Sequence, residues 1–182
     1  MGKDGSAGRD QAGTGRLSEL EDDMAEVKPG RWMADIEGDF VVFLIGARIG
    51  RGRVLKAFGD LGGRRGMMHM LKHLSERPDS GLLGYQMSTF GGLVVQYWRS
   101  FEHLERFATN PDDPHLAVWR NYWKRLGKDP GTGIWHETYL VRAGEYEAIY
   151  GNMPPVGLGK ASTLVTVAEG TGARQRLRRR AS

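Results

Sequence analysis

The chain has 182 residues, no cysteine, 27 glycines and a formal net charge of +4. This length favours one domain with tails, and the absence of cysteine excludes disulfides, thiolate metal sites, iron–sulfur clusters and a cysteine nucleophile. Five arginines lie within residues 174–180, and without them 21 basic and 22 acidic side chains remain. The basic character therefore belongs to the tail, which permits weak, salt-sensitive contact with RNA or anionic surfaces but predicts no specific nucleic-acid partner.

The chain shows no sign of membrane insertion. Its longest apolar run, residues 40–45, is far shorter than a membrane-spanning helix. The N-terminal stretch is rich in Gly, Asp and Lys and has no apolar signal-peptide segment. We therefore expect a cytoplasmic protein without a membrane partner, with a disordered arm at residues 1–30, a folded domain at 31–168 and a disordered Arg-rich tail at 169–182.

The domain begins with a strand at residues 40–49, which is β-branched and apolar on both alternating faces. A helical pattern over 53–76 follows, interrupted by glycines. Two strands at 82–90 and 93–101 flank Gly91 and Gly92, which is a hairpin signal.

A short helix at 101–107 comes next, then a helix at 114–126 that begins at Pro114, and a last strand at 133–141. The order β-α-β-β-α-β predicts a ferredoxin-like α+β fold. Helices on one face of such a sheet leave the other face bare, although its first strand is apolar on both sides. We therefore predict a homodimer with facing sheets, which is a dimeric α+β barrel.

His136 is the most informative candidate for chemistry. Strand alternation places it on one face of the last strand with Ile134, whereas Trp135 and Glu137 point to the other face. An imidazole beside apolar strand neighbours suits three roles: an acid/base, a haem ligand or a structural hydrogen-bonding group. The sequence pattern leaves these three open.

The hairpin strand that follows Gly92 supplies further candidates. Tyr97 and Arg99 alternate with Gln96 and Trp98, so polar and aromatic groups share an interior strand. Such a mixture suits an apolar cavity with a few orienting groups, although Trp98 packed on helices and Arg99 paired with an acid would explain it equally well. His115, in the first turn of the helix at 114–126, is a candidate for the cavity mouth or for a surface role.

Five ordered segments resemble the monooxygenase-like family typified by the small oxygenase of the fumagillin pathway. They are residues 33–46, residues 96–104 with Gln-Tyr-Trp-Arg-Ser-Phe, residues 115–120, residues 133–139 with Ile-Trp-His-Glu-Thr-Tyr, and residues 150–160. The resemblance runs from about residue 31 to residue 168. It implies a dimeric α+β barrel, in agreement with the order of elements.

The superfamily includes cofactor-free monooxygenases and haem proteins, among them haem-containing aldoxime dehydratases. The resemblance therefore implies haem b, or no cofactor, with His136 on the iron in the haem case. The strand that holds His136 and Glu137 resembles the strand that carries the haem-ligating histidine in the dehydratases. Arg99 and Trp98 join His136 and Glu137 as predicted catalytic residues, while Tyr97, Gln96, Trp135 and His115 are predicted to line the substrate pocket.

Three functions follow as hypotheses. The first is a monooxygenase-like oxidoreductase of specialised metabolism that acts on a hydrophobic small molecule. Without haem, a base and oxyanion stabilisers suffice, because a stabilised carbanion reacts directly with oxygen. The second is a haem-dependent lyase of the aldoxime dehydratase type, and the third is a barrel that only binds a small ligand. Apart from possible haem iron at His136, we predict no metal site.

Overall fold

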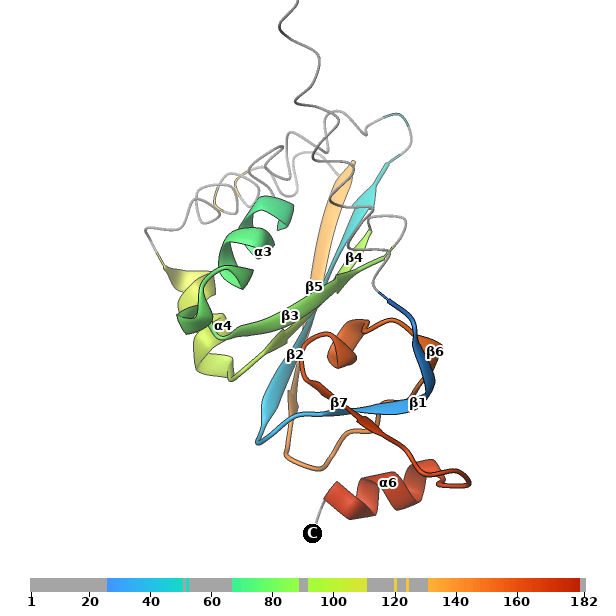
Figure 1. Cartoon of the computed structure of the whole chain (residues 1–182). Coiled ribbons are helices and arrows are strands. Elements are labelled where there is room, and N and C mark those ends of the chain that lie inside the picture. Colours follow the sequence, from blue (N-terminus) through green and yellow to red (C-terminus); the bar gives the residue numbers. More distant parts are fainter. Residues whose placement is uncertain are drawn as a thin grey trace, which may run out of the picture.

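The computed structural model describes residues 26–50, 52, 67–88, 92–110, 120, 124 and 131–180. Within these residues the chain forms a four-stranded and a three-stranded antiparallel sheet, and helices α3 (Met67–Ser75) and α4 (Phe101–Thr109) lie on one side of the larger sheet (Figure 1). The predicted α+β class is thereby confirmed.

The larger sheet contains the four strands that the sequence predicts. Its order is β3-β4-β2-β5, and every neighbouring pair is antiparallel. The strands are β2 (Phe40–Ile49), β3 (Leu82–Met87), β4 (Leu93–Trp98) and β5 (Thr132–Val141). The run of β-branched and apolar residues in β2 explains its interior position, because an interior strand is covered on both faces.

Helices α3 and α4 cover one face of this sheet, which we call the helix side. Val41 of β2 and Trp98 of β4 pack there against Leu74 of α3 and Leu104 of α4. Strand β4 ends at Trp98, earlier than predicted, because Ser100 caps the start of α4. The Ser100 hydroxyl accepts a hydrogen bond from the backbone N–H of His103.

A second sheet, which the sequence did not predict, lies against part of the opposite face. Its order is β6-β1-β7, formed by β1 (Lys28–Asp35), β6 (Tyr150–Met153) and β7 (Thr163–Thr166). Residues 28–30 are therefore part of a strand and not of the predicted arm. Two of the strands have only four residues each, so they carry too little alternation to be recognised.

The second sheet and the segments beside it bury one end of the apolar β2 strand. Phe40 of β2 is buried with Ala34, Ile36, Tyr146 and Leu158, all supplied by the same chain. The Phe40 and Tyr146 rings meet edge to face, with 5.1 Å between centroids. Part of the face that we expected a second copy to cover is thus covered by the chain itself.

The Arg-rich tail also differs from the prediction. Instead of a disordered segment, residues 173–180 form helix α6 (Ala173–Arg180). Its Arg176 is buried, and the guanidinium Nε donates to Glu147 Oε1 at 2.7 Å. An ion pair with a residue 29 positions earlier in the chain holds the helix in place, which charge counting could not reveal.

Several predictions concern residues outside the described ranges. These are residues 53–66 of the helical pattern predicted at 53–76, the tip of the hairpin at 89–91, and the helix at 114–126 apart from Arg120 and Lys124, which are helical. The division into arm, domain and tail as a whole stays a prediction. Among the described helices, none is long and apolar enough to cross a membrane.

Candidate functional site

His136 lies on the helix side of the larger sheet. It pairs with Ile45 in the register of β5 with β2, and Ile45 belongs to the core beneath α3. The imidazole is exposed and lies beside the ring of Phe43, with 5.5 Å between centroids and 34° between planes. It forms no hydrogen bond with any residue that the structure describes. Among the described residues, nothing occupies its ring nitrogens.

Gln96 and Trp98 share this face but are core residues. Trp98 is fully buried and stacks on Phe107 at 5.4 Å. Its indole N–H donates to Gln96 Oε1 at 3.0 Å, and Gln96 Nε2 donates to the sulfur of Met67 at 3.6 Å. Their polar groups are thus satisfied within the core, as the packing alternative for Trp98 anticipates.

Trp135 and Glu137 lie on the opposite face, because neighbouring residues of a strand point to opposite sides. Trp135 is 45% exposed and lies across Gly46, where an added Cβ would come within 2.4 Å of the indole nitrogen. Glu137 Oε2 accepts a hydrogen bond from the Tyr139 hydroxyl at 2.6 Å, and this bond raises the pKa of Tyr139. Glu137 is therefore occupied on the face that His136 does not share.

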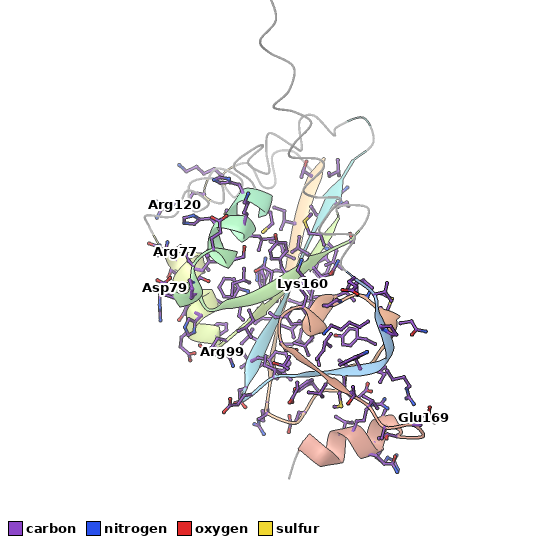
Figure 2. All side chains as sticks on the ribbon, viewed as in Figure 1. Arg77, Asp79, Arg99, Arg120, Lys160 and Glu169 are labelled. Atoms are coloured by element: carbon purple, nitrogen blue, oxygen red, sulfur yellow. The ribbon has the colours of Figure 1, made fainter. Side chains whose placement is uncertain are left out.

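The remaining predicted residues are placed separately. Arg99 follows the end of β4, near α4 (Figure 2), and its guanidinium donates to the backbone oxygen of Glu37 at 2.9 Å. It pairs with a carbonyl and not with the acid considered above. Tyr97 points toward the second sheet, and His115 lies outside the described residues. The predicted site residues thus do not form one cluster, and their roles stay predictions.

A cavity of about 650 Å³ opens between the two sheets, on the face opposite His136. Tyr97 from β4 and Tyr150 from β6 line it, together with the short helix η3 (Gly157–Gly159), which lies between the sheets (Figure 1). The volume falls within the range of small-molecule sites.

Strand alternation pointed to Tyr97, but no sequence pattern singled out Tyr150 or η3 as part of a site. The Gly-Leu-Gly of η3 was the available signal, because an added Cβ at Gly159 would lie 2.9 Å from the Tyr150 ring. Only glycine leaves room for the ring there.

The described residues contain no cluster of side chains typical of a metal site. Among them, no group of three or more His, Asp or Glu side chains could hold a metal ion.

The chain has recognisable relatives in sequence. The family model described as Monooxygenase af470-like matches residues 40–158. Monooxygenase af470 from Aspergillus fumigatus is 32% identical over 74 residues, which cover 40% of this chain and 25% of that protein. The chain therefore corresponds to only a fraction of the length of this relative.

Solved structures similar in fold include two of aldoxime dehydratase. One is OxdRE in complex with butyraldoxime, with a TM-score of 0.55 and 19% identity over 85% of this chain and 44% of that chain. The other has a TM-score of 0.51 and 21% identity over 85% of this chain and 45% of that chain. These likenesses concern the fold alone. The match over residues 40–158 covers more than half of the sequence, and the chain belongs to the Monooxygenase af470-like family.

Proposed function

We propose that the protein is a monooxygenase-like oxidoreductase that acts on a hydrophobic small molecule, with His136 as its catalytic base or haem ligand. The observation that carries the proposal is the exposed imidazole beside Phe43, whose nitrogens bind no described residue. Membership of a family named for a monooxygenase supports an oxidative reaction.

The residues present fit haem in one respect. His136 would supply a ring nitrogen to hold the iron, and Phe43 offers an apolar surface beside it. Ligating histidines usually donate their other N–H to a carboxylate or carbonyl, and within the described residues His136 has no such partner. A ring nitrogen of His136 is therefore available to ligate iron, but no hydrogen bond from the described residues fixes the orientation of the ring.

His136 would act differently in the two forms of the reaction. With haem b bound, it would hold the iron, and the cofactor would supply the redox chemistry. Without a cofactor, its ring nitrogen would remove a proton from the substrate carbon next to a carbonyl. The resulting carbanion would form a C–O bond with molecular oxygen, and the peroxide formed would take the proton back from the imidazolium. In both forms Phe43 would pack against the apolar part of the bound molecule.

A second candidate is a haem-dependent lyase of the aldoxime dehydratase type. The observation that favours it is the fold likeness to two dehydratases over 85% of the chain. In this case His136 would again hold the iron. A barrel that binds a small ligand without turnover is the non-enzymatic alternative.

The fold supports a dimer as part of the proposal. The larger sheet has the strand order that a ferredoxin-like β-α-β-β-α-β chain produces. Trp135 and Tyr139 are 45% and 51% exposed on the face opposite the helices. We propose that a second copy covers this part of the face, which the second sheet leaves open, to form the dimeric α+β barrel. Light scattering at micromolar concentration tests this, and a monomer would refute it.

Haem titration followed by the Soret absorption tests the role of His136. His136→Ala is compared with His73→Ala, which removes an exposed histidine of α3. If His136 holds haem, only His136→Ala loses the band. Stoichiometric haem binding by His136→Ala overturns the assignment. If the wild type binds no haem, oxygen uptake with enolisable substrates separates an oxygenase from a passive binder, and turnover of butyraldoxime would instead support the lyase.

A further inference from the structure

The cavity between the two sheets is a second place where this chain can hold a small molecule. Its walls are mainly apolar and come from β2, β5 and the segment that carries β6; they include Phe40, Val42, Val141, Met153 and Val156. Val42 and Val141 point away from the helix side, since their partners in the register are Tyr97 and Phe40. The cavity is therefore separated from His136 by the larger sheet.

Two tyrosine hydroxyls meet η3 at one wall of this cavity. The Tyr150 hydroxyl accepts a hydrogen bond from the backbone N–H of Gly159 at 2.8 Å. The Tyr97 hydroxyl lies against the same turn, where an added Cβ at Gly157 would come within 3.2 Å of it. Both hydroxyls thus lie against one short backbone segment.

A phenol that accepts a hydrogen bond still has its own proton to donate. Neither Tyr97 nor Tyr150 donates to a residue that the structure describes. Tyr146, in the same cavity, differs because its hydroxyl accepts from the Ile36 N–H at 2.8 Å and donates to the Ile36 carbonyl at 3.3 Å. Among the described residues, nothing takes up the two donors at the η3 wall, while the third phenol is already occupied.

The charges around the cavity select the kind of acceptor that these donors would bind. Burial raises the pKa of both Tyr97 and Tyr150, so both remain protonated donors at neutral pH. Glu145 and Glu147 also line the cavity, and Glu147 is paired with Arg176. An anionic ligand would be repelled by the carboxylate of Glu145. A neutral ligand with one strong acceptor oxygen avoids that cost.

We propose that the cavity binds a neutral, mainly apolar molecule whose carbonyl oxygen accepts hydrogen bonds from the hydroxyls of Tyr97 and Tyr150. The apolar part of the molecule lies against Val42, Val141 and Met153. A volume of about 650 Å³ accommodates a ligand of two or three rings. This binding is distinct from the proposed chemistry at His136 and does not depend on it.

Binding of 2-acetylnaphthalene, labelled with carbon-13 at the carbonyl, tests the proposal on the full chain. Calorimetry gives its affinity, and difference infrared spectroscopy gives its C=O stretching frequency. We expect the frequency to fall below that in an apolar solvent, because two donors polarise the bond. 2-Ethylnaphthalene, which lacks the acceptor, and 2-naphthoate, which is charged, should bind more weakly.

Three variants examine the donors. Tyr97→Phe and Tyr150→Phe should each weaken ketone binding about three- to tenfold and raise the C=O frequency, because one hydrogen bond is lost. Tyr146→Phe is the matched control: it removes a phenol oxygen from the same cavity but should leave the frequency unchanged. Because the C=O frequency reports direct donation, it separates this role from a purely structural one.

Two outcomes measured on the wild type overturn the proposal even where no variant folds. Equal affinity of the wild type for the ketone and 2-ethylnaphthalene, or tighter binding of 2-naphthoate, contradicts it. An unchanged C=O frequency in a folded Tyr97→Phe or Tyr150→Phe protein does so as well. Ketone binding should survive His136→Ala, so failure of the haem or oxygenase test leaves this result separate.

Discussion

Trp98→Phe tests whether this tryptophan is a core residue, as its contacts indicate, or a catalytic one. The change removes the indole N–H and leaves Gln96 Oε1 as a buried acceptor without its donor, which costs about 1–3 kcal/mol. The smaller ring also leaves a gap beside Phe107, at about 1–2 kcal/mol. We expect the free energy of unfolding to fall by about 2–5 kcal/mol, measured by urea denaturation followed by circular dichroism.

A double-mutant cycle isolates the hydrogen bond from the packing. Gln96→Leu alone leaves the Trp98 N–H without a partner, whereas Gln96→Leu with Trp98→Phe removes donor and acceptor together. The double variant should therefore lose about 1–2 kcal/mol less than the sum of the single losses. Trp135→Phe is the control, because this indole is 45% exposed and we expect a change below about 1 kcal/mol.

Two results would refute the reasoning. If the unfolding free-energy losses of the two single variants add up to the loss of the double variant within about 0.5 kcal/mol, the Gln96 and Trp98 side chains are not coupled. Full stability of Trp98→Phe with loss of substrate binding or turnover would return Trp98 to the catalytic role that the sequence suggested.

Three further predictions concern the cap of α4, the position of α6 and the buried phenols. Ser100→Ala removes the cap and should cost about 1 kcal/mol of unfolding free energy in urea denaturation; no loss would contradict the capping contact. Arg176→Leu removes the partner of Glu147 and should cost about 2–4 kcal/mol and speed hydrogen exchange in α6; unchanged exchange would show that the pair does not hold the helix. Burial raises the pKa of Tyr97 and Tyr150, so their contribution to stability is complete below the ordinary value of about 10 and is lost as the pH rises through the folded values. Alkaline unfolding should therefore have a shallower pH dependence in the Tyr97→Phe, Tyr150→Phe double variant, and identical slopes would contradict this.

Matched controls separate each effect from general loss of stability. Thr109→Ala removes a hydroxyl at the other end of α4, which donates to the backbone oxygen of Glu105 at 2.8 Å and does not cap the start of the helix. Arg174→Leu changes an exposed arginine of α6 and should leave hydrogen exchange in that helix nearly unchanged. Tyr139→Phe removes an exposed phenol whose pKa is raised mainly by Glu137, so it measures how much of the alkaline pH dependence comes from a source other than burial.

The larger sheet could be predicted because its strands carry strong local signals. Strand β2 is a ten-residue β-branched run, and the Gly91 and Gly92 pair marks the hairpin that joins β3 and β4. Alternation also predicted correctly that His136 and Glu137 lie on opposite faces. What alternation could not tell was which face the helices cover, since that depends on the direction in which the chain crosses the sheet.

The second sheet and α6 depend on contacts between distant residues. Trp32 in β1 pairs with Tyr150 and Thr166, more than one hundred positions later. Arg176 is charged and would be assigned to solvent from its type alone, yet Glu147 compensates its burial. Four-residue strands and a single ion pair leave almost no local pattern, so the sequence could not predict the walls of the inter-sheet cavity.

The second sheet has a consequence for how the candidate groups can cooperate. A ligand held by Tyr97 and Tyr150 contacts the face of β2 that carries Val42, whereas His136 lies beside Phe43, the next residue, on the other face. The sheet backbone separates the two positions, so one small molecule cannot bridge them. The proposed reaction at His136 and the proposed carbonyl binding between the sheets would therefore be two separate binding events, and we expect that each one can be abolished without the other.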